Sequence, residues 1–234
     1  MEAAAGRDDA VLIIDVLRFS SATVTAVSNG FTVIPATSMA EAKKLALKYD
    51  GCLNRSGRRV LSPKSFIGKA PCRVVLPSPN GAALSCHAAG AKNAFVASLL
   101  NISATAEKLN NVVKKSKQDV TIVASGEVGE GRRKMMPVFE RRLDTKDENF
   151  CFEDYVCAGA VSSLLKAGKS DSILRAEKAF RMFSVHLKEA LLDCASGRYL
   201  IKDGLKNDVE FYSRLDVFSV VPAIHKFKWG AEIG

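Results

Sequence analysis

Short apolar runs alternate with segments of helical periodicity along most of the chain. The first run covers residues 11–14, consists of branched apolar residues and ends at the carboxylate of Asp15. A wholly apolar run between polar residues is typical of a buried parallel strand. Apolar positions then recur with helical spacing, so we expect a helix with Ser20 or Ser21 as its N-cap and Gly30 at its end.

The same alternation continues through most of the remaining chain. Further strands are predicted at residues 32–36, 72–76, 93–97, 119–124 and 216–221. One helix is predicted from a capping box of Ser38 and Glu41, and others at residues 82–89, 102–113, 151–168, 170–196 and 207–214. Alternating strands and helices predict an α/β fold with helices layered around a mostly parallel sheet.

Small and polar residues follow four of the predicted strands. These turns contain, in chain order, Asp15 with Arg18, Asn80 with Gly81, Asn101, and residues 125–127. The carboxyl ends of parallel strands share one edge of a sheet, where open α/β sheets bind ligands and where helix N-termini favour anions. The turns therefore predict an anion site at that edge. Position alone supports equally well that Asp15 caps a turn and pairs with Arg18.

Two adjacent acids, Glu153 and Asp154, open the helix predicted at residues 151–168. The helix dipole favours an acid in a first turn by about 0.3–1 kcal/mol, which is a sufficient structural reason for them. The functional alternative is that they hold a metal beside the anion site.

Two stretches lack regular periodicity. Residues 51–72 are rich in Gly, Ser, Pro and basic residues, and a loop of this length is more often functional than idle. Residues 128–149 carry dense mixed charge, so we expect an insertion or lid there. The prediction is one α/β domain over residues 1–234, which would divide into two lobes, if at all, near residues 127–150.

Composition narrows the classes of partner. The net charge is +9, but the basic residues are dispersed and aromatic residues make up only 7% of the chain, so a stacking platform for nucleic acid is not indicated. Solvated helix faces account for most of the charge, and attraction of a small, multiply anionic substrate is the next explanation. Nucleic-acid binding is the least supported explanation of the positive charge.

The sequence shows neither a targeting segment nor a cysteine pattern typical of a zinc site. The first residues lack the features of a secretory signal, and no apolar run approaches the ~20 residues of a membrane span, so we expect a cytoplasmic protein without membrane association. The six cysteines are too widely spaced for a zinc pattern, and we expect them to be reduced and buried.

In order and spacing, these motifs resemble the 2-phosphosulfolactate phosphatase family, the magnesium-dependent phosphatases of coenzyme M biosynthesis. The resemblance extends over residues 11–222 and rests on IDVLRFSSATVTAVSNG, PNGAALS, SLLNISATA, FEDYVCAGA and SGRYLIKDGLKNDVEFYSRLDVFSVVP. It implies an α/β fold with mixed sheets between helices. It also implies Mg²⁺-assisted hydrolysis of a phosphate monoester, here 2-phosphosulfolactate to sulfolactate and phosphate.

The family's motif residues have counterparts in this chain. They are Asp15 and Arg18 after the first strand, Asn80 and Gly81 in the Asn-Gly turn, the later Asn101, the acidic pair Glu153 and Asp154, and Ser62 with Pro63. Mg²⁺ prefers hard oxygen ligands, so we assign Asp15, Glu153 and Asp154 to the metal. Arg18 suits a bidentate phosphate contact.

The remaining roles follow from the same resemblance. Asp15 and Arg18 are the expected catalytic residues, and the expected phosphate-binding set is Arg18, Ser20, Ser21, Asn80, Gly81 and Asn101. The attacking group is either a water molecule or a carboxylate such as Asp15, and the sequence does not decide between them.

Departures from the family pattern lie at residues 52–64 and 78–79, where Leu61 replaces an asparagine and Ser78 and Pro79 replace threonines. The resemblance implies that these loops contact the substrate, so the sequence does not identify the physiological substrate. The alternative function is a catalytically divergent anion- or nucleotide-binding protein of the same fold. The expected partner is a small anionic phosphate ester, with a homodimer as one option for assembly.

Overall fold

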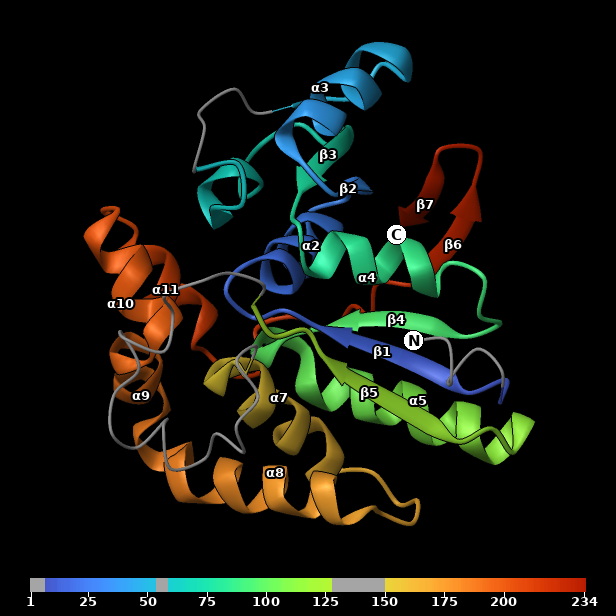
Figure 1. Cartoon of the computed structure of the whole chain (residues 1–234), viewed down its shortest axis with the longest axis vertical. Coiled ribbons are helices and arrows are strands. Elements are labelled where there is room, and N and C mark those ends of the chain that lie inside the picture. The colour runs from blue at the N-terminus through green and yellow to red at the C-terminus, as the bar shows by residue number, and fades with distance from the viewer. Residues whose placement is uncertain (1–6, 54–58, 128–149) are drawn as a thin grey trace.

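A computed structural model describes residues 7–53, 59–127 and 150–234. Its centre is a three-stranded parallel sheet in the order β4-β1-β5, formed by β4 (Ala94–Ala97), β1 (Ala10–Ile14) and β5 (Val120–Ala124) (Figure 1). Ile14 pairs in register with the last residues of both neighbours, Ala97 and Ala124. The carboxyl ends of all three strands therefore lie at one level.

A second, four-stranded sheet has the order β3-β2-β7-β6. It consists of β2 (Thr32–Ala36), β3 (Arg73–Pro77), β6 (Ile224–Phe227) and β7 (Gly230–Ile233). The β2 and β3 strands are parallel, whereas β7 is antiparallel to both of its neighbours. The fold is therefore α/β with one parallel and one mixed sheet, which confirms the predicted class.

Two helices, α2 (Phe19–Ser28) and α4 (Gly81–Ala88), lie between the sheets (Figure 1). Their apolar side chains share one core cluster with side chains from both sheets. The helix α3 (Met39–Lys48) covers the other face of the mixed sheet. The outer face of the parallel sheet packs on α5 (Ile102–Ser116) and α7 (Phe152–Ser163).

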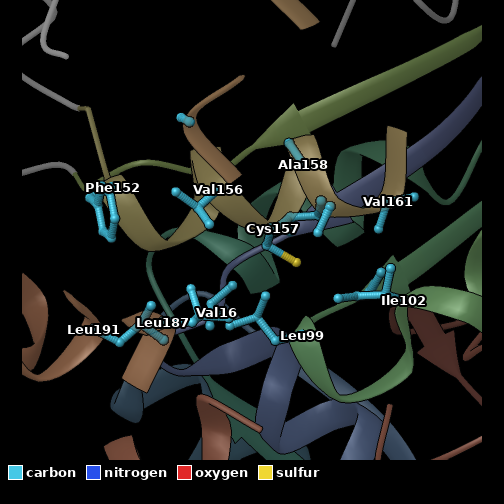
Figure 2. Packing of buried hydrophobic residues seen from close by; sticks show 14 of the residues in the cluster. Val16, Leu99, Ile102, Phe152, Val156, Cys157, Ala158, Val161, Leu187 and Leu191 are labelled. Carbon is cyan, nitrogen blue, oxygen red and sulfur yellow. The ribbon is translucent and has the colours of Figure 1, made fainter. Parts of the chain in front are cut away.

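Four C-terminal helices follow α7. They are α8 (Asp171–Phe183), α9 (Leu187–Asp193), α10 (Ala195–Lys202) and α11 (Lys206–Tyr212). The helix α8 packs along α7, and the other three pack on one another beside it (Figure 1). Figure 2 shows side chains of α7, among them Val156 and Cys157, against Val16 and residues of α9. This packing fixes the helix that carries the acidic pair.

The strand β1 is apolar throughout because both of its faces are buried. Leu12 and Ile14 point into the cluster with α5 and α7, whereas Val11 and Ile13 point into the cluster with α2 and α4. A strand between two layers cannot alternate apolar and polar residues. The interpretation of this run as a buried parallel strand is confirmed.

Two predictions about the helices were wrong. The helix α2 begins at Phe19 with Arg18 as an N-cap that makes no side-chain cap bond, so Ser20 and Ser21 lie inside its first turn. The helix predicted at residues 170–196 is divided into α8, a 3₁₀ turn (Ser184–His186) and α9. An amphipathic stripe can continue across such breaks because each short helix buries the same side.

Gly197 does not end a helix, contrary to prediction, but lies inside α10. Cys194 is extended at the N-cap, and its Sγ accepts the Gly197 N–H at 3.3 Å. A Cβ on Gly197 would lie 1.8 Å from the Leu191 carbonyl oxygen. The glycine is therefore required by close backbone packing of α9 and α10.

The end of the chain also differs from prediction. In the described structure, residues 216–221 form no strand, although the Asp216 and Phe218 N–H groups bond to the carbonyls of Leu99 and Leu100. The hairpin β6–β7 was missed because exposed polar residues break its apolar pattern.

All six cysteines are free, but Cys52 is exposed, so the expectation that they are all buried was wrong.

Candidate functional site

Asp15 lies directly after β1 and is 6% exposed. Its Oδ1 accepts the N–H of Phe19 at 3.2 Å. Its Oδ2 accepts the N–H of Gly81 at 2.9 Å and the Ser78 hydroxyl at 3.3 Å. The carboxylate is thus held by the first residues of both α2 and α4, where the helix dipoles favour negative charge.

The close approach of α4 to Asp15 depends on a glycine. A Cβ on Gly81 would lie 2.6 Å from both Asp15 Oδ2 and Phe19 Cδ1. The turn after β3 therefore reaches Asp15 although β3 belongs to the second sheet. The expectation that all four polar turns follow strands of a single sheet was wrong.

Asp154 comes from α7 on the other side of β1. Its Oδ1 accepts the Val16 N–H at 2.7 Å, and its Oδ2 accepts the Gly126 N–H at 3.1 Å. Its neighbour Glu153 is 1% exposed, and the Cys194 thiol lies 3.5 Å from Glu153 Oε2. The structure thus brings the carboxylates of Asp15 and Asp154 to the carboxyl ends of β1 and β5, with Glu153 buried nearby.

Burial and mutual repulsion alter the acidity of this cluster. Burial is the main cause that raises the pKa of Asp15, and the charge of Glu153 adds to it. The pKa of Asp154 lies well above its usual range because of burial and because of the charges of Glu153 and Asp15. Such a cluster is stabilised by a bound cation or by a proton.

The donor set fits Mg²⁺ by type. Among the described residues, no group of three or more His, Cys, Asp or Glu side chains is placed so that it could hold a metal ion. Mg²⁺ often uses one or two carboxylates and completes its octahedron with water and substrate phosphate. Buried carboxylate oxygens that repel one another fit such partial coordination.

Arg18 lies at the start of α2, and the peptide bond before it is cis. Its Nη1 is 3.5 Å from Oδ2 of Asp208 on α11. The other oxygen of Asp208 accepts the Ser62 hydroxyl at 2.8 Å. Sequence reasoning did not assign Asp208 to the site, although Asp208 lies in the C-terminal segment on which the family resemblance partly rests.

The other predicted binding residues differ in their surroundings. The Ser20 hydroxyl accepts the Asp15 N–H at 2.8 Å, so Ser20 supports the turn. The buried Ser21 Oγ and Asn80 Oδ1 have no hydrogen-bond partner among the described residues. Asn101 is fully buried; its side chain accepts the Ser98 N–H and donates to the Val220 carbonyl. These bonds give Asn101 a structural role. Ser21 and Asn80 lie close in the chain to Phe19 and Gly81, whose N–H groups hold Asp15.

A cavity of about 530 Å³ lies away from this site, at the amino-terminal end of β5. Polar groups that line it are already paired: Arg7 with Asp9, Thr121 with Asp9, and Ser162 with Glu177.

No described helix is long and apolar enough to cross a membrane.

Comparison with known proteins gives one consistent family. The family model described as 2-phosphosulpholactate phosphatase matches residues 2–226. A Thermotoga maritima protein named a probable 2-phosphosulfolactate phosphatase is 31% identical over 226 residues, which cover 91% of this chain and 88% of that protein. Proteins of the same name from Carboxydothermus hydrogenoformans and Gloeobacter violaceus are 29% and 26% identical, over 93% of this chain and 87% and 89% of their own length.

Proposed function

The chain belongs to the 2-phosphosulfolactate phosphatase family, whose members are phosphoric monoester hydrolases. We propose that it hydrolyses 2-phosphosulfolactate to sulfolactate and inorganic phosphate with the aid of Mg²⁺. The observation that carries the proposal is the carboxylate of Asp15, held between the N-termini of α2 and α4 and buried near Glu153 and Asp154. A buried acidic cluster, with an arginine three residues after Asp15 at the start of α2, is a suitable place for a metal and a phosphate.

The chemistry requires charge neutralisation and alignment. A phosphate monoester resists attack because its oxygens are negative, so catalysis depends on positioning and on electrostatic stabilisation. The guanidinium of Arg18 can bind two of these oxygens in a fork geometry. One or two of the carboxylates of Asp15, Glu153 and Asp154 would hold Mg²⁺, with water and substrate phosphate as its other ligands; when bound, the ion supplies positive charge to the phosphate oxygens.

Water is the attacking group that the geometry favours. Both oxygens of Asp15 already accept hydrogen bonds, one from Phe19 and two from Gly81 and Ser78. These bonds fix the orientation of both oxygens, so neither is free to turn toward phosphorus for an in-line attack. We therefore assign Asp15 to holding the metal and aligning the site rather than to a covalent intermediate.

The test is phosphate release from 2-phosphosulfolactate and from a panel of small anionic phosphate esters, with Mg²⁺ and with EDTA. We expect turnover with Mg²⁺, its loss in EDTA, and a preference for the ester that also carries a sulfonate and a carboxylate. Equal rates with Mg²⁺ and EDTA would contradict the metal assignment. Binding of phosphate without hydrolysis of any ester would instead support the alternative, an anion-binding protein of the same fold.

A further inference from the structure

A hydrogen-bonded cluster around Asp208 joins three distant segments at the edge of the site. Asp208 lies in the first turn of α11 and is 4% exposed. Its two carboxylate oxygens contact different partners, the Ser62 hydroxyl at 2.8 Å and Arg18 Nη1 at 3.5 Å. A buried carboxylate is costly unless it is paired and hydrogen-bonded, and these two contacts meet that requirement.

The Arg18 side chain is more exposed to solvent than that of Asp208, at 11% against 5%. Among the described residues, Asp208 is the acid that pairs with the Arg18 guanidinium. A guanidinium has five N–H donors and a bidentate phosphate contact uses two, so donors remain for an anion.

We propose that Asp208 is a positioning residue, which orients the Arg18 guanidinium toward the substrate phosphate and ties it to the segment of Ser62. The inference rests on the proposed function, since it takes Arg18 as the phosphate contact. Asp208 itself does not bind the phosphate, because two anions would repel each other. It holds one edge of the Arg18 guanidinium, so that the N–H groups that do not contact Asp208 stay directed toward the phosphate.

A purely structural role is the competing explanation. Tyr212, one turn further along α11, donates from its hydroxyl to the Leu61 carbonyl at 2.7 Å. This bond also ties α11 to the segment before Ser62. The charges of Asp208 and Arg18 shift the pKa of the Tyr212 hydroxyl in opposite directions, but the Arg18–Asp208 ion pair does not use that hydroxyl. Tyr212→Phe therefore provides a matched control that loosens the same junction and leaves the arginine pair in place.

The experiment is a double-mutant cycle with wild type, Asp208→Asn, Arg18→Ala and the double variant. The asparagine still accepts from Ser62 but removes the charge that faces Arg18. We expect kcat/KM for 2-phosphosulfolactate, measured with Mg²⁺, to fall on the order of tenfold or more in Asp208→Asn and to show no further fall when Arg18 is already alanine. Asp208→Glu should restore part of the loss, and Tyr212→Phe should lower thermal stability with kcat/KM unchanged.

Two results would overturn the proposal: a wild-type kcat/KM in Asp208→Asn, or the same loss in both arginine backgrounds. If the wild type hydrolyses no ester, the proposed function fails by itself. The affinity of the same four proteins for inorganic phosphate, measured by calorimetry, then decides the role of Asp208. A loss of affinity that depends on Arg18 supports it, and an additive or absent loss overturns it.

Discussion

Asp15 and Gly81 are 66 positions apart, yet the amide of one bonds directly to the carboxylate of the other. The contact is possible because Gly81 has no Cβ and α4 can begin against Asp15. Backbone N–H donors hold the carboxylate without the mobility of a long side chain. At the scale of the residue, the site therefore depends as much on a glycine as on its acids.

Gly81→Ala should disable the site while the chain still folds. A Cβ placed 2.6 Å from Asp15 Oδ2 and Phe19 Cδ1 must displace the carboxylate. A displacement of about 1 Å can cost a reaction 100-fold, and we expect a loss of kcat/KM of that order. Gly90→Ala is the control, because nothing lies within 4 Å of its added Cβ. Wild-type kinetics in Gly81→Ala would show that Asp15 is not held as described.

The raised pKa values of Asp15 and Asp154 predict how stability depends on pH. A carboxyl whose pKa is higher in the folded than in the unfolded state favours folding when protonated. Its contribution is complete below the unfolded value near pH ~3.9 and is lost as pH rises through the folded value. Thermal melts in EDTA should therefore show these groups favouring the fold more at mildly acidic than at neutral pH.

The control for this pH dependence is Asp154→Asn, which cannot titrate. Its melting temperature should vary less with pH than that of the wild type over the same range. Mg²⁺ competes with protons for the same carboxylates, so its stabilising effect should grow as pH rises. An identical pH dependence in the two proteins would contradict the assignment of the shift to Asp154.

At the scale of the element, α7 is the helix on which the acidic pair depends. It packs so closely on α8 that a Cβ on Gly159 would lie 2.1 Å from the Ala176 carbonyl oxygen. Its apolar face contacts Val16 and other residues of the core around β1 (Figure 2). The position of Glu153 and Asp154 is therefore set by helix packing on both sides of α7.

Gly159→Ala tests this packing, because two effects predict opposite signs. Helix propensity alone would make alanine more stable by about 1 kcal/mol. Overpacking against the α8 backbone should destabilise the fold by about 1–3 kcal/mol or more, and we expect it to dominate. Chemical denaturation measures the difference, with Gly168→Ala as a control whose Cβ meets nothing within 4 Å. A stabilised Gly159→Ala protein would exclude the close contact.

Much of the element order could be predicted from local patterns. The strand at residues 32–36 was predicted with the bounds that the structure has. The Ser38 side chain accepts the Glu41 N–H, but the Glu41 carboxylate accepts from Thr37 instead of the Ser38 N–H, so only half of the predicted capping box forms. Periodicity reports burial, however, and not connectivity. It therefore could not show the breaks after Phe183 and Asp193, nor the hairpin β6–β7, whose exposed face is polar.

At the scale of the whole molecule, the site is assembled from segments that belong to different layers. Asp15 follows the parallel sheet, Gly81 follows the mixed sheet, and Asp154 lies on a helix of the outer layer. Motif spacing pointed to these residues, but pairing between sheets is a long-range property that it does not encode. Asp208 was missed for the same reason, since its partner Arg18 is 190 positions away.

Some predictions lie outside the described residues or outside any comparison. The insertion or lid expected at residues 128–149 falls in the part that the structure does not describe. The predicted homodimer, the cytoplasmic location and the division into lobes near residues 127–150 stay predictions. The family and the class of enzyme, by contrast, are confirmed by the family model and by the curated relatives.

The most direct test of the central claim is the rate of phosphate release from 2-phosphosulfolactate by the purified protein with Mg²⁺, compared with that of Asp15→Asn. The substitution nearly preserves the size of the side chain and removes the charge that Phe19, Gly81 and Ser78 stabilise. We predict turnover by the wild type and only the enzyme-free rate for Asp15→Asn, with both proteins folded by circular dichroism. Equal turnover by the two proteins would contradict the account.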